Sequence, residues 1–125
     1  MIQIYHNSRC SKSRQCLALI ENSGKKFEVI KYLENPLTNI ELTEIISKLE
    51  IEPFDLVRKK EKIWIEEFKN KTLSPKELIE IMVKNPLLIE RPIVIKGKKA
   101  VVARPIEKVI GIIKYLFNIS LATHP

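Results

Sequence analysis

Cysteine, glycine and aromatic residues are scarce in this chain of 125 residues. There are two cysteines and three glycines, and aromatic residues make up 6% of the sequence. Two cysteines are too few for a disulfide scaffold, so we expect a reducing, cytoplasmic setting in which a cysteine is catalytic or simply buried. With three glycines and seven prolines, collagen-like and linker-like sequences are excluded.

Long hydrophobic runs are also missing. No segment approaches the roughly 18 apolar residues that a membrane span needs. The most apolar stretch, from Val109 to Leu121, is interrupted by Gly111, Lys114 and Asn118. The sequence opens directly on a strand pattern without a basic leader, so we expect no signal peptide and no membrane partner.

The charge is clearly basic, with a formal net value of +7. Such a charge is compatible with nucleic acid or with small anions as partners. Because aromatic residues are few and no block of Lys and Arg is longer than three, we expect no nucleic-acid partner. A hydrophobic content of 45% in 125 residues predicts one globular domain over residues 1–125, which we expect to be a monomer without a bound cofactor or metal.

Strand and helix signals alternate along the chain. Strands are predicted at 2–5, 27–33, 93–95 and 100–103, and helices at 11–22, after the capping boxes at Thr38 and Ser74, and from Pro105 onward. Pro53 is expected to end or offset the second helix. The order β-α-β, then helices, then β-β-α is typical of the thioredoxin-like fold. It predicts a mixed four-stranded sheet with a helical insertion at about 38–86 and a tail at about 119–125.

Cys10 is the candidate nucleophile. It lies between the first strand and the first helix, and it is flanked by Arg9, Lys12 and Arg14. The free N–H groups at a helix N-terminus stabilise a thiolate, and so do nearby cations. A buried, inert cysteine is the alternative, but a polar and cationic loop is a poor place to bury one.

Cys16 leaves two interpretations open. It falls on the apolar face of the first helix, which is typical of a core cysteine, but it could also be a resolving cysteine for Cys10. Six helical residues span about 9 Å, whereas the Cα atoms of a disulfide lie within about 7 Å, so pairing would require part of the helix to unwind.

Two other cysteine motifs are excluded by spacing. A redox C-x-x-C motif would need a cysteine where Ser13 stands, and a phosphatase C-x5-R loop would need an arginine where Cys16 stands. The two histidines and two cysteines, His6, Cys10, Cys16 and His124, show no usual zinc spacing.

Two Arg-Pro pairs flank the predicted hairpin. Arg91-Pro92 precedes its first strand and Arg104-Pro105 follows its second. Guanidinium groups bind tetrahedral oxyanions in a bidentate manner, so two arginines at strand ends beside a thiolate indicate an anion site. Arg58 is a weaker third candidate, because its basic stretch alone is typical of a surface loop. His6 either tunes the thiolate or is an ordinary loop residue.

Five segments together resemble the glutaredoxin-coupled arsenate reductase family. They are YHNSRCSKSR at 5–14, YLENP at 32–36, LVRK at 56–59, IERPIV at 89–94 and ARP at 103–105. The resemblance implies that Cys10 attacks arsenate and that Arg58, Arg91 and Arg104 bind the oxyanion. It implies a cis bond at Arg91-Pro92, and supporting roles for His6, Ser13, Arg14 and Pro92.

The expected activity is thiol-dependent reduction of arsenate to arsenite. The resemblance implies glutathione as co-substrate and glutaredoxin as partner. Cys16 departs from the family pattern, so an internal disulfide reduced by thioredoxin stays open. The alternative function is a thiol-redox sensor or RNA-polymerase-binding regulator of the same fold family, although Ser13 removes the C-x-x-C switch of such regulators.

Overall fold

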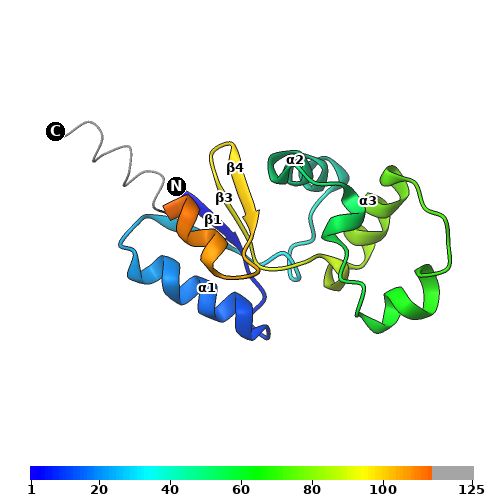
Figure 1. Cartoon of the computed structure of the whole chain (residues 1–125), viewed down its shortest axis with the longest axis horizontal. Helices are drawn as coiled ribbons and strands as arrows, with labels where there is room; N and C mark the ends of the chain where they lie inside the picture. The colour runs from blue at the N-terminus through cyan, green and yellow to red at the C-terminus, as the bar shows by residue number, and fades with distance from the viewer. Residues whose placement is uncertain (114–125) are drawn as a thin grey trace. The chain divides into compact units, whose positions relative to one another are not determined.

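The computed structural model describes residues 1–113 of the chain. These residues belong to two compact units (Figure 1). One unit, called the sheet unit here, comprises Met1–Lys31 and the chain from Arg91 onward, and the other, the helical unit, comprises Tyr32–Glu90. The helical unit contains the insertion predicted at about 38–86, and the single-domain organisation stays a prediction.

The sheet unit is built on four strands in the order β2-β1-β3-β4. β1 (Ile2–Tyr5) pairs in parallel with β2 (Phe27–Ile30), and α1 (Ser11–Asn22) connects the two. β3 (Ile93–Lys96) pairs antiparallel with β1 and with β4 (Lys99–Val102). The predicted mixed sheet of four strands is therefore confirmed, and so is the hairpin that completes it.

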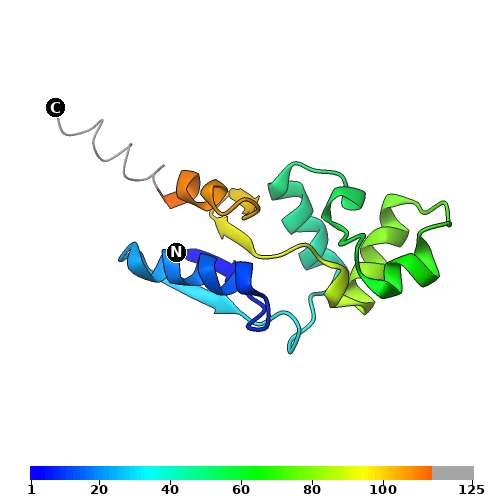
Figure 2. The ribbon, with the colours of Figure 1, turned by 60° about the horizontal axis from the view of Figure 1, so that its bottom comes forward.

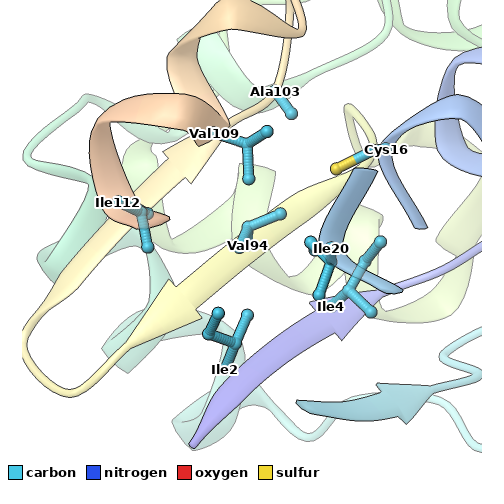
Figure 3. Packing of buried hydrophobic residues seen from close by; sticks show 8 residues of the cluster. All are labelled: Ile2, Ile4, Cys16, Ile20, Val94, Ala103, Val109 and Ile112. Atoms are coloured by element: carbon cyan, nitrogen blue, oxygen red, sulfur yellow. The ribbon is translucent and has the colours of Figure 1, made fainter. Parts of the chain in front are cut away.

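Side-chain alternation explains the core of the sheet unit. Ile2 and Ile4 of β1 are fully buried, because successive strand residues point to opposite faces. They pack with Val94 of β3, with Cys16 and Ile20 of α1, and with Ala103, Val109 and Ile112 (Figure 3). Residues 107–113 are helical, so α1 and this segment cover the same face of the sheet. Figure 2 shows α1 beside the parallel strand pair from a second direction.

Both α-helices of the helical unit start at the predicted capping boxes. In α2 (Asn39–Leu49) the Glu41 N–H donates to Thr38 Oγ1 at 3.1 Å, and the Thr38 N–H donates back to the Glu41 carboxylate. α3 (Pro75–Lys84) has the same pair of bonds between Ser74 and Glu77. Each box satisfies two N–H groups that a helix start leaves without a partner.

Short turns complete the helical unit. They are η1 (Pro53–Leu56), the π-helical η2 (Trp64–Phe68) and η3 (Pro86–Leu88). An antiparallel bridge between Val57, which follows η1, and Ile89, which follows η3, connects the middle of the unit to its C-terminal end. Its core consists of buried aliphatic side chains and Trp64, including Leu42, Ile45, Ile46, Leu56, Leu78, Met82 and Leu88.

Several predicted boundaries were wrong. β2 ends at Ile30 rather than at residue 33, because the chain turns at Tyr32. α2 ends at Leu49, and the C-cap Glu50 closes the helix with a left-handed backbone (φ +56°), whereas Pro53 starts η1. The predicted tail at 119–125 lies outside the described residues. Among residues 1–113, no helix has the length and apolar character that a membrane crossing requires.

Candidate active site

One edge of the sheet gathers the residues that the sequence analysis singled out. Tyr5 at the end of β1 pairs with Ile93 at the start of β3, and Ile93 pairs with Val102 at the end of β4. The loop that leads to Cys10 follows Tyr5, Arg91 precedes Ile93 by two residues, and Arg104 follows Val102 by two. This register places the cysteine loop and both arginines at the same edge.

Backbone bonds hold the cysteine loop, residues 6–10, in one conformation. The Cys10 N–H donates to the Asn7 carbonyl at 3.0 Å, and the Arg9 N–H donates to Asn7 Oδ1 at 3.0 Å. The Arg14 guanidinium donates to the Ser8 carbonyl at 2.8 Å. Cys10 itself is the N-cap of α1, with extended backbone angles of φ −94° and ψ 121°. The predicted position of Cys10 at a helix N-terminus is confirmed.

Two arginines of the sheet unit, Arg91 and Arg104, contact the Cys10 sulfur. Arg104 Nη2 donates to Sγ at 3.6 Å, while Arg104 Nε donates to the Arg91 carbonyl at 2.6 Å. Arg91 is largely buried. The peptide bonds Arg91-Pro92 and Arg104-Pro105 are both cis. The resemblance implied the first of these.

The surroundings of Cys10 favour the thiolate. Burial raises the pKa of the Cys10 thiol, but three hydrogen bonds outweigh burial: one from the Ser13 backbone N–H, one from the Arg91 side chain and one from the Lys12 backbone N–H. The charge of Arg91 lowers the pKa further. The pKa of Cys10 therefore lies below its ordinary value, and the half-buried sulfur has the properties of a nucleophile.

The buried Ser13 hydroxyl forms hydrogen bonds with two residues of the cysteine loop. Ser13 is fully buried, and its Oγ accepts from the Asn7 backbone N–H at 3.1 Å and shares a hydrogen bond of 2.7 Å with His6 Nδ1. Burial lowers the pKa of His6, and the charges of Lys31 and Arg14 lower it further. His6 is therefore neutral at pH 7 and acts as a hydrogen-bonding group in this network.

Asn7 is the residue that sequence reasoning missed. It is nearly fully buried, and it links three parts of the site through its carbonyl, its side chain and its N–H. An asparagine whose side chain bonds the backbone two residues on is an Asx turn, and the Asn-Ser-Arg sequence was the signal that could have indicated it.

Cys16 is placed in the core of the sheet unit. Its side chain is fully buried among Ile4, Ile20 and Val94 (Figure 3). Burial raises the pKa of its thiol to about 11, so it is protonated at neutral pH. Both cysteines are free thiols.

Arg58 belongs to the helical unit. Its backbone N–H donates to the Leu88 carbonyl at 2.7 Å, beside the bridge between Val57 and Ile89. Its side chain forms ion pairs with Glu61 at 3.1 Å and with Glu90 at 3.7 Å. Its role as an oxyanion ligand stays a prediction from the resemblance.

Known proteins resemble this chain in sequence and in fold. The family model described as ArsC family matches residues 5–112. The chain belongs to the ArsC family. This ArsC-family chain is 41% identical over 114 residues to a protein of Escherichia coli K12 named "Uncharacterized protein YfgD", covering 90% of this chain and 96% of the relative. It is 40% identical over 110 residues to an arsenate reductase of Neisseria meningitidis, covering 86% and 94%.

The fold of this ArsC-family chain matches a solved structure. An arsenate reductase from Vibrio cholerae matches with a TM-score of 0.83 and 41% identity, covering 87% of this chain and 94% of the other. The mixed sheet with its added helices is a thioredoxin-like fold, as the order of predicted elements indicated.

Proposed function

We propose that this protein is an oxidoreductase that reduces arsenate to arsenite through Cys10. The relatives from Neisseria meningitidis and Vibrio cholerae are named arsenate reductases, and they match nearly the whole chain. The observation that carries the proposal is the 3.6 Å contact between Arg104 Nη2 and Cys10 Sγ at the N-terminus of α1. It puts a cation that binds oxyanions beside a thiolate.

The first step is attack of the Cys10 thiolate on arsenic. A sulfur–arsenic bond forms, and one arsenate oxygen leaves as water after it takes up protons. Arg91 and Arg104 offset the negative charge of the oxyanion as it enters and of the transition state. Both arginines stay charged at any working pH, so the anion site does not depend on a protonation event.

The second step transfers the electrons. A second thiol attacks the Cys10 sulfur, a disulfide forms, and the electron pair of the sulfur–arsenic bond stays on arsenic. Arsenic is thereby reduced from the +5 to the +3 state, and arsenite leaves. Two thiols have been oxidised to one disulfide, which balances the two electrons that arsenic gains. Thiolates suit both steps because they are strong nucleophiles.

An external thiol is the better candidate for the second step than Cys16. Cys16 is fully buried, and its pKa is raised to about 11, so it supplies almost no thiolate at neutral pH. We therefore propose glutathione as co-substrate, with glutaredoxin or thioredoxin then reducing the disulfide on Cys10. Such donors fit a reducing cytoplasm.

We assign Arg58 no step in this mechanism. Any oxyanion that it bound would compete with the carboxylates of Glu61 and Glu90, which it already contacts. Arsenate turnover of Arg58→Ala, compared with that of Arg91→Ala, measures how much Arg58 contributes.

NADPH-coupled arsenate turnover tests the proposal. Wild type, Cys10→Ser and Cys16→Ser are each assayed with glutathione plus glutaredoxin, and separately with thioredoxin. We expect turnover with glutathione plus glutaredoxin that disappears in Cys10→Ser and persists in Cys16→Ser. Arg91→Ala should lower turnover far more than it lowers the free energy of unfolding. Absence of turnover with either donor, in folded protein with a reactive Cys10, would overturn the proposal.

A further inference from the structure

A groove in the helical unit is lined by none of the residues assigned to the candidate active site. Its volume is about 670 Å³, within the range of roughly 300–1,000 Å³ that small-molecule sites occupy. Trp64 and Leu78 are buried at 5% exposure each, whereas Phe54 and Ile65 are each 48% exposed. The groove therefore has a packed apolar base and presents further apolar surface to solvent.

Contacts between aromatic rings fix the floor of the groove without a bound ligand. The Trp64 ring lies 6.1 Å from the Phe54 ring and 6.0 Å from the Phe68 ring, in tilted arrangements that aromatic pairs prefer. Trp64 starts the π-helical turn η2, in which the Lys69 N–H donates to the Trp64 carbonyl at 2.8 Å. π-Helical turns are rare in proteins, and those that occur are frequently found at functional sites.

The lining of the groove is cationic as well as apolar. Its charged members are all lysines, at positions 59, 60, 69 and 71, and no carboxylate lines it. Among residues 1–113, none of these four lysines forms an ion pair; Lys62, which pairs with Glu66, does not line the groove. Lys59 is fixed by a 2.8 Å hydrogen bond to the Phe54 carbonyl and lies 4.1 Å over the Phe54 ring.

We propose that this lysine-rimmed groove binds a small aromatic anion. The aromatic body of the ligand would pack against Trp64 and Phe54, and its carboxylate or phosphate would bind the lysine ammonium groups. The volume suits one or two linked rings rather than a macromolecule. The proposal rests on the helical unit alone and does not depend on arsenate chemistry.

Trp64 is the single tryptophan of the chain, so its indole N–H gives one reporter signal inside the groove. We would titrate ¹⁵N-labelled protein with three matched probes that share a biphenyl body: biphenyl-4-carboxylate, biphenyl-4-methanol and biphenyl-4-methylamine. The carboxylate should shift the Trp64 resonance and bind more tightly than the alcohol, because it forms ion pairs with the lysines. The difference in affinity should be only about fivefold, because individual exposed ion pairs are weak. The amine should bind more weakly than the alcohol.

Two double variants separate this groove from general charge effects. Lys69→Gln with Lys71→Gln should remove the preference for the carboxylate over the alcohol. Lys84→Gln with Lys98→Gln removes the same charge from exposed positions outside the groove and should keep that preference. Equal binding of carboxylate and alcohol to wild type, no shift of the Trp64 signal, or equal loss in both double variants would each overturn the proposal.

Discussion

Replacing Arg104 with glutamine should make Cys10 a poorer thiolate. Arg104 Nη2 lies 3.6 Å from Cys10 Sγ, and a positive charge at that distance favours the negative form of the thiol. The substitution keeps a polar side chain but removes the charge, and the shorter glutamine also loses the Arg104 Nε bond to the Arg91 carbonyl. The pKa of Cys10 should therefore rise. It should not return fully to its ordinary value, because Arg91 and the backbone N–H groups of α1 still lower it.

Coulomb's law sets the size of the effect. Two unit charges 3.6 Å apart interact by about 1.2 kcal/mol in bulk water and by about 4.6 kcal/mol at an effective dielectric constant of 20. Cys10 is only half-buried, so the lower value is the appropriate one. It corresponds to a thiolate population about eightfold smaller at any pH well below the pKa.

The pH profile of Cys10 alkylation by iodoacetamide measures this population. Cys16 does not interfere, because it is buried and its pKa is raised to about 11. Arg9→Gln is the matched control: Arg9 is adjacent in sequence but exposed, and among residues 1–113 the hydrogen bond from an arginine side chain to Cys10 Sγ at 3.6 Å comes from Arg104 and not from Arg9. An unchanged profile in Arg104→Gln, or an equal displacement in Arg9→Gln, would refute the reasoning.

Three further predictions concern the residues around the cysteine loop. Ser13→Ala should lower the free energy of unfolding by about 1–3 kcal/mol, because it leaves the buried Asn7 N–H without its partner; denaturant unfolding measures this, and the exposed Ser11→Ala should stay near wild type. Cys16→Ser should lose stability by about 1–3 kcal/mol through its buried hydroxyl yet keep glutathione-dependent turnover; loss of turnover in the folded variant would show that Cys16 resolves. Because the pKa of His6 is lowered from 6.5, the unfolded chain takes up a proton that the folded chain does not, so stability should decline as the pH falls below about 6.5. His6→Gln should flatten the pH dependence of the unfolding free energy below about pH 6.5, and an equally steep profile would contradict this account.

The fold was predictable because its signals are local. The helix starts are indicated by capping boxes whose hydrogen bonds join residues three positions apart, Thr38 with Glu41 and Ser74 with Glu77. Alternation in β1 indicated the buried face of the sheet. The Arg-Pro pairs marked the ends of the hairpin strands, and strand register alone then placed both arginines at the edge where Cys10 lies.

Other features depend on contacts that local patterns do not encode. Ser13 in the first turn of a helix resembles an exposed residue, and only the packing of the loop buries it against His6 and Asn7. The π-helical turn at Trp64 and the left-handed Glu50 carry no strong sequence signal. The lysine-rimmed groove required side chains from three separate segments of the helical unit, so its lysines appeared in the sequence only as scattered basic residues.

A single turnover, quenched in acid, tests the central claim most directly. Reduced protein would be mixed with arsenate and glutathione in the absence of glutaredoxin, and arsenite and the protein adduct would be quantified together by mass spectrometry with peptide mapping. The mechanism predicts one arsenite for each glutathione attached to Cys10, none attached to Cys16, and neither product in Cys10→Ser. Arsenite formed at the wild-type rate by Cys10→Ser, or formed without any modification of Cys10, would contradict it.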